Sequence, residues 1–163
     1  MFVLEHLWSY SAAWLTVGFL GLCAITDVLY RRVSETAIFC FALAVMFAHF
    51  SWVAVASGLL CAVLWWVSDR RNAALGDIEM AALTGFGLGP FSLIAIAISC
   101  ALALLTRPWW PRLSSRLTPP EERHLAPSGL YLAVGALVTV LMARWFVAGL
   151  QEYTSYVVMQ VAQ

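Results

Sequence analysis

One stretch of the chain, from Ala37 to Val67, contains no charged residue. As a single α-helix it would be about 46 Å long, whereas the hydrocarbon core of a bilayer is about 30 Å thick. We therefore expect two shorter spans, separated at the polar group around His49 to Ser51. In the whole chain 63% of residues are apolar and 11% are charged, against about a quarter charged in soluble domains. The sequence thus predicts an integral membrane protein.

The apolar runs predict an all-α fold, a polytopic bundle of about six transmembrane helices, with residues 1–163 forming a single domain. The expected spans are residues 8–30, the two halves of 37–67, 78–88, 91–105 and a last span from about 127 to 141. The proline-rich residues 107–126 are expected to form a polar cytoplasmic loop. The tail, residues 145–163, is expected either to lie at the membrane interface or to continue the last span.

The arginines predict the orientation of this bundle. With six spans, every arginine except Arg144 falls on one side of the membrane, and the positive-inside rule makes that side cytoplasmic. Both termini are then expected outside. Because Glu5 but no basic residue precedes the first apolar run, we expect the N-terminus to be a span and not a cleavable signal.

The composition also argues against several classes of site. The net charge is zero and the pI is about 6.8, so no basic field attracts nucleic acid. The four cysteines lie inside apolar runs without a Cys-x-x-Cys pair, and the three histidines are isolated. We therefore expect neither a metal site nor a cofactor.

Two aspartates stand out in this apolar sequence. Asp27 lies near the end of the first run, and Asp77 follows Gly76 at the start of the fourth. An acid at membrane depth is costly and is a functional hypothesis by default. Taken singly, Asp77 could cap a helix and Asp27 could pair with Arg31. Together, at the same end of two neighbouring hairpins, they favour an acid/base pair.

Small residues accompany the first of these acids. Gly18, Gly21 and Ala24 precede Asp27 at three-residue spacing, which keeps them near one side of a helix. Small residues let membrane helices approach closely. We therefore expect this side to face the bundle interior and to carry Asp27 with it.

The segments around the two aspartates resemble motifs of the type IV prepilin peptidases, membrane aspartyl proteases of the GxGD class. The first motif is Ala24–Glu35, and the second is Ala74–Glu79, which precedes a glycine-rich run. A weaker third feature is the entry to the last span, Pro127-Ser128-Gly129. The positions that depart from the family pattern are Ser34, Glu35, Ala74 and Glu79.

The resemblance implies a small, peptidase-only enzyme of the bacterial inner membrane, with Asp27 and Asp77 as the catalytic residues and without metal or cofactor. It implies a protein substrate of the prepilin or pseudopilin type, with a basic leader, a glycine before the cut and a hydrophobic helix after it. The oligomeric state stays open. The residues implied in substrate binding or in supporting the site are Gly76, Arg31, Glu35, Glu79, Pro127 and Gly129.

The roles of the two acids are predicted from their places on helices. Asp77 begins a helix, where the dipole favours a negative charge, so we expect it to be the base and Asp27 the acid. Two alternatives to an enzyme remain at this stage. The replaced motif residues are compatible with an inactive scaffold subunit of a pilus, conjugation or secretion system. A small transporter or proton channel would also use membrane acids.

Overall fold

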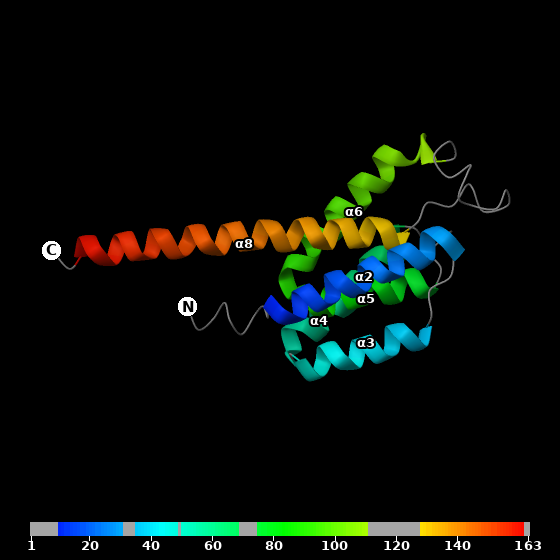
Figure 1. The fold of residues 1–163 in the computed structure, drawn as a ribbon, viewed down its shortest axis with the longest axis horizontal. Coiled ribbons are helices and arrows are strands. Elements are labelled where there is room, and N and C mark those ends of the chain that lie inside the picture. The colour runs from blue at the N-terminus through cyan, green and yellow to red at the C-terminus, as the bar shows by residue number, and fades with distance from the viewer. Residues whose placement is uncertain (1–9, 31–34, 49, 69–74, 111–127, 162–163) are drawn as a thin grey trace.

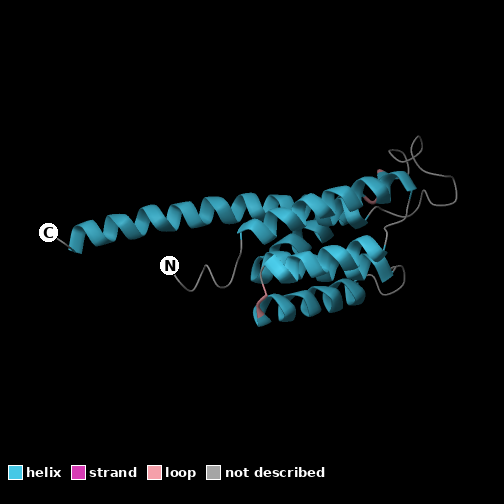
Figure 2. Ribbon diagram, turned by 60° about the horizontal axis from the view of Figure 1, so that its bottom comes forward, coloured by secondary structure: helices cyan, strands magenta, loops and turns pink. Residues whose placement is uncertain are grey.

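The computed structural model of the chain describes residues 10–30, 35–48, 50–68, 75–110 and 128–161. Within these ranges the backbone is helical apart from short turns and contains no strand (Figure 2). The predicted all-α class is therefore confirmed. In chain order the helices are α2 (Tyr10–Tyr30), α3 (Glu35–Ala48), α4 (Trp52–Ser68), α5 (Leu75–Leu88), the 3-10 turn η1 (Gly89–Phe91), α6 (Ser92–Thr106) and α8 (Ser128–Val161).

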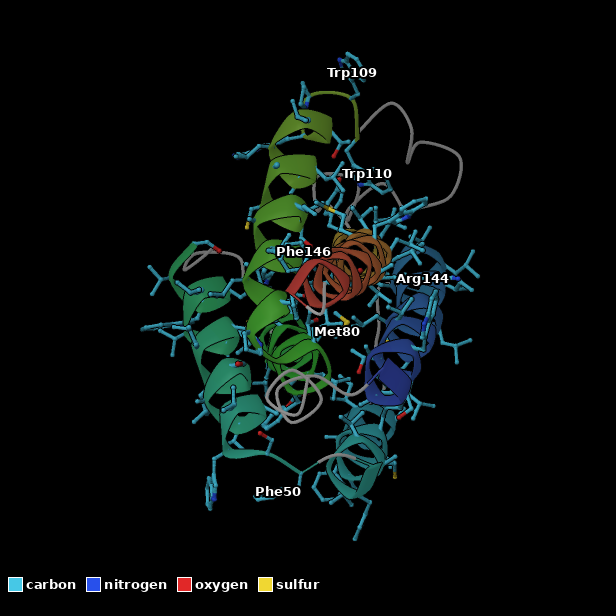
Figure 3. The ribbon with its side chains drawn as sticks, turned by 90° about the vertical axis from the view of Figure 1, so that its left-hand side faces the viewer. Phe50, Met80, Trp109, Trp110, Arg144 and Phe146 are labelled. Carbon is cyan, nitrogen blue, oxygen red and sulfur yellow. The ribbon has the colours of Figure 1, made fainter. Side chains whose placement is uncertain are left out.

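The central helix of the bundle is α5, which contacts all of the other helices. Its most extensive packing is against α4, whereas α8 packs mainly against α2 and α6. Figure 1 shows α2, α3, α5 and the first part of α8 lying along a common direction. Met80 of α5 is fully buried and lies at the centre of the bundle, between α2 and α8 (Figure 3). The core around it is formed by apolar side chains that include Leu20, Leu88, Leu132 and Val140.

Two interruptions of the helices fall where the sequence predicted them. Between α3 and α4, Ser51 caps the new helix, since its hydroxyl accepts a hydrogen bond from the Val53 N–H at 3.2 Å. Between α5 and α6, Gly89 adopts a positive φ of 54°, which a glycine tolerates without steric cost, and Pro90 follows it. The chain changes direction there, so α6 runs at an angle to α5 (Figure 1) and packs mainly against α8.

Three segments of the described residues are long and apolar enough to cross a bilayer: Ser11–Leu29, Leu75–Thr106 and Ser128–Phe146. The second of them contains the break between α5 and α6. The apolar helices Thr36–Val45 and Trp52–Ser68 are shorter. This architecture is compatible with a multi-pass membrane protein, but six spans are not confirmed by it.

The outer surface of the bundle is apolar. Large side chains such as Phe47 (88% exposed), Trp52 (77%) and Leu22 (64%) are open to the surroundings on three different helices. Soluble proteins rarely expose apolar patches larger than a few hundred Å². Exposing such a surface to water is unfavourable, whereas exposing it to lipid is not. The apolar surface thus agrees with the membrane protein that the composition predicts.

The last helix is longer than a membrane span. Residues 145–161 of the tail do not form a separate interfacial helix, because α8 continues without a break from Ser128 to Val161. A helix of 34 residues is about 51 Å long, well beyond the thickness of a hydrocarbon core. Its C-terminal part projects past the other helices (Figure 1).

Glycines set the closest helix contacts, although not the ones expected on α2. A Cβ added at Gly85 would lie 2.5 Å from the Cα of Gly58, so α5 and α4 touch backbone to backbone. By contrast, a Cβ added at Gly18 or Gly21 would meet nothing within 4 Å. The expectation that these two glycines face the bundle interior is therefore wrong. Only the end of that line, Ala24 and Asp27, is buried.

Candidate active site

Three helix ends meet at one end of the bundle. They are the C-terminal end of α2, the N-terminal end of α5 and the N-terminal end of α8, all at the right in Figure 1. Asp27 lies in the last turns of α2 and is only 8% exposed, and Asp77 lies in the first turn of α5. The two acids thus come from helices that are adjacent in space but separated by α3 and α4 in the sequence.

The start of α8 joins the two acids. The backbone N–H of Gly129 donates a hydrogen bond to Asp27 Oδ2, with an N···O distance of 3.0 Å. The hydroxyl of Ser128 donates a hydrogen bond to Asp77 Oδ1. Because Ser128 and Gly129 are consecutive residues, one dipeptide holds both carboxyl groups. The juxtaposition of Asp27 and Asp77 expected from the sequence is therefore present in the fold.

The N-terminus of α8 is a suitable place for a carboxylate. The first N–H groups of a helix have no partner within it, and the helix dipole adds partial positive charge there. Gly129 supplies one of these N–H groups to Asp27. Each acid thus lies at a helix N-terminus, Asp77 on its own helix and Asp27 on α8. The helix dipole therefore acts on both acids and does not decide which of them is the base. The assignment of Asp77 as the base and Asp27 as the acid stays a prediction.

The glycine at position 129 allows a close contact with Asp27. A Cβ added at Gly129 would lie 3.2 Å from Asp27 Oδ2, 3.3 Å from Asp27 Cβ and 3.5 Å from the Cα of Ala24. The first two distances are tighter than ordinary van der Waals contact. Gly129, proposed from the sequence as a supporting residue, therefore lets α8 approach α2 closely enough for its N–H to reach the carboxylate.

The first turn of α8 is tied to α6. Ser99 of α6 donates from its hydroxyl to the carbonyl oxygen of Tyr131 at 2.9 Å. The Tyr131 hydroxyl lies 2.5 Å from the hydroxyl of Thr106, near the end of α6. Tyr131 itself is 5% exposed. These contacts fix the helix end that carries Ser128 and Gly129.

Glu79 does not belong to the acid pair. Residues two positions apart on a helix point about 200° apart, so Glu79 leaves α5 on a different side from Asp77. Its Oε2 is buried and has no hydrogen-bond partner among the residues that the structure describes. Gly76 lies beside Asp77, and a Cβ there would meet nothing within 4 Å, so packing does not demand a glycine.

The remaining residues expected at the site are not placed. Arg31 and Pro127 lie outside the described residues, and of Glu35 only the backbone, at the start of α3, is described. Among the described side chains, no three His, Cys, Asp or Glu residues lie close enough together to hold a metal ion.

Ser128 is the site residue that the sequence analysis missed. It was read only as the middle residue of the Pro-x-Gly entry to the last span. The sequence did contain a signal for it. A serine at the first position of a predicted helix lies close to the N–H groups that have no partner within the helix, and serine is a common capping residue there.

An open apolar groove lies beside the end of α2 that carries Asp27. It has a volume of about 380 Å³ and runs along α2 where that helix meets α8. Ala24 lines it one turn before Asp27, and Leu130 lines it directly after Gly129. The groove is bordered further by Gly21, Ile25, Val28, Leu29 and Ala133.

Comparisons with known proteins add no relative. No family model matches the sequence, and neither a curated protein nor a solved structure matches it.

Proposed function

We propose that this chain is an intramembrane aspartyl endopeptidase that removes the basic leader from prepilin-like or pseudopilin-like precursors at the cytoplasmic face of the bacterial inner membrane. The observation that carries the proposal is the hydrogen bonding of Asp27 and Asp77 to the consecutive residues Gly129 and Ser128. The resemblance of the segments around these residues to the type IV prepilin peptidases supports it.

The chemistry needs two carboxyl groups that share about one proton. The ionised carboxylate takes a proton from water as the water oxygen attacks the scissile carbonyl carbon, and the protonated carboxyl gives its proton to the carbonyl oxygen. Two neighbouring carboxyls cannot easily both be charged, so they form such an unequal pair. Because both acids lie at helix ends and not mid-span, water from the membrane surface can reach them.

The surroundings of the pair fit the proposed substrate. The apolar groove beside Ala24 and Leu130 suits the hydrophobic segment that follows the cut, because these two residues lie close to Asp27 and Gly129 in the chain. In this proposal Glu35 and Glu79 are the acidic residues that support binding of the basic leader, as the family resemblance implies. Lipid surrounds the remaining apolar surface in this proposal.

We propose six spans, with α3, α4, α5 and α6 crossing as short helices. A helix of 14 to 17 residues is about 21 to 26 Å long, somewhat less than the hydrocarbon core. The helix ends, including the acids, then lie slightly inside the membrane. This arrangement places both termini outside and the loop of residues 107–126 in the cytoplasm.

Thiol labelling tests this topology. In a variant without the native cysteines, a single cysteine introduced by Asp69→Cys or Ser115→Cys should not react with an impermeant reagent added to intact cells. A cysteine introduced by His49→Cys or Gln151→Cys should react. Labelling at position 115 from outside would contradict the six-span orientation.

Cleavage of a defined precursor tests the activity. The chain is co-expressed in bacterial membranes with a protein that carries a basic leader, a glycine and a hydrophobic helix. Mass spectrometry should find a product that begins directly after the glycine, and replacement of that glycine should prevent its formation. An inactive scaffold subunit, the alternative, would leave the precursor intact.

Gly129→Ala tests the contact between α8 and Asp27. The added methyl group displaces the carboxylate by a few tenths of an ångström, so we expect cleavage to slow about tenfold while the fold persists. Gly149→Ala is the matched control, because it lies on the same helix and its Cβ would meet nothing within 4 Å. Equal cleavage rates for the two variants would show that Asp27 tolerates the displacement.

A further inference from the structure

The two acids are held by groups of different chemistry. The Gly129 N–H is a backbone amide, which can only donate a hydrogen bond, and it donates to Asp27 Oδ2. Asp77 Oδ1 is bonded by the Ser128 hydroxyl, which can donate or accept. An amide donor holds a carboxyl only through an oxygen that carries no proton. A hydroxyl can hold a carboxyl oxygen with or without its proton.

We propose that Ser128 is a positioning residue that keeps the carboxyl group of Asp77 in place in both of its protonation states. This inference deepens the proposed function and rests on it. When Asp77 Oδ1 carries no proton, the hydroxyl donates to it, which is the arrangement observed. When Oδ1 is protonated, the hydroxyl rotates about its C–O bond and accepts from it. The carboxyl group then gains or loses its proton without losing its partner.

The scaffold around Ser128 has the rigidity that this role needs. Ser128 is the first residue of α8, and its neighbour Gly129 is bonded to buried Asp27. One turn later, Tyr131 is bonded through its carbonyl oxygen to Ser99 and through its hydroxyl to Thr106. The helix turn that begins with Ser128 is thus held in place, and the Ser128 hydroxyl can reorient about its C–O bond.

The opposite acid receives a complementary constraint. Because Gly129 N–H can bond only an unprotonated oxygen, a proton on Asp27 belongs on Oδ1 and not on Oδ2. The dipeptide Ser128-Gly129 therefore treats the two acids differently. Asp77 can gain or lose its proton at Oδ1, the oxygen that Ser128 bonds, whereas Asp27 must do so at Oδ1, the oxygen that Gly129 does not bond.

Kinetics of Ser128 variants test the proposal. Ser128→Ala should lower kcat about 10- to 100-fold through a misplaced carboxyl, with KM changed by less than about twofold. Ser128→Thr, which keeps a hydroxyl, should restore most of the activity. The control is Thr139→Val, which removes a buried hydroxyl of the same helix that bonds only its own Gly135 carbonyl among the contacts described. This control should cleave as the wild type does.

Two kinetic results would overturn the proposal. One is a wild-type kcat for Ser128→Ala, and the other is an equal loss in Ser128→Ala and Thr139→Val, which would indicate a merely structural effect. Ser128→Cys serves if the alanine variant does not fold. A thiol is a weaker hydrogen-bond partner of nearly the same shape, so kcat should fall to an intermediate value.

Infrared spectroscopy gives a second measurement that does not depend on cleavage. In protein labelled with carbon-13 at the aspartate carboxyls, the stretching bands of Asp77 are assigned by their loss in Asp77→Asn. They should shift in Ser128→Ala, because a hydrogen-bond partner is lost, and return in Ser128→Thr. Unshifted bands would reject the proposal. If the wild-type chain cleaves no basic-leader precursor, the proposed function fails, while these bands still decide whether Ser128 holds Asp77.

Discussion

Asp27→Asn and Asp77→Asn should each lower the cleavage of a basic-leader precursor by about 1,000-fold or more, because each removes one carboxyl of the proton-sharing pair. The fold should survive both changes. An asparagine side chain keeps an oxygen that can accept from the Gly129 N–H at position 27 or from the Ser128 hydroxyl at position 77. Groups that act as a unit are not additive, so the double variant should cleave no more slowly than either single variant.

The measurement is the amount of precursor converted in membranes with matched levels of each variant. Asp69→Asn, which changes the one aspartate of the chain outside the pair, is the control and should retain activity. Folding is checked by the thermal unfolding midpoint of the detergent-solubilised protein. Near-normal cleavage by either single variant would show that Asp27 and Asp77 do not work as a catalytic pair.

Gly85→Ala should strongly destabilise the bundle. The added Cβ would lie 2.5 Å from the Gly58 Cα and 2.5 Å from the Ser57 carbonyl oxygen, and both are backbone atoms of α4. Neither can rotate away as the end of a side chain can, so α4 and α5 must separate. Overpacking of this kind costs about 1–3 kcal/mol, and it acts at the most extensive contact between the described helices.

Gly18→Ala is the matched control for this substitution. It makes the same chemical change inside α2, but its Cβ would meet nothing within 4 Å. Alanine also favours the helix by about 1 kcal/mol over glycine, so this variant should be neutral or stabilised. Thermal unfolding in detergent compares the two. A similar unfolding midpoint for Gly85→Ala and Gly18→Ala would mean that α4 and α5 do not pack through their glycines.

The helices and their interruptions were accessible from the sequence because their causes are local. The polar group at His49 to Ser51 and the pair Gly89-Pro90 break the apolar runs at the places where α3 and α5 end. The apolar composition also predicted that the outer surface of the bundle would expose apolar side chains. The candidate acids were found for a related reason, since a carboxyl in such a sequence is conspicuous wherever it lies.

The sequence did not show which of the small residues contact a neighbouring helix. Gly18 and Gly85 look alike in the sequence, each in an apolar run and on a line of small residues that includes an aspartate. In the structure a Cβ would have open space at Gly18 but would strike α4 at Gly85. Spacing along a helix defines a side of it, but which neighbour covers that side depends on the packing of the other helices.

The sequence by itself determined that the chain is helical and apolar, where its helices break, and that Asp27 and Asp77 are its notable acids. Only the tertiary structure decided what holds them. Ser128 bonds Asp77 from 51 positions away along the chain, and Gly129 bonds Asp27 from 102 positions away. Contacts over such distances arise from the packing of α8 against α2, α5 and α6, and no local pattern encodes them.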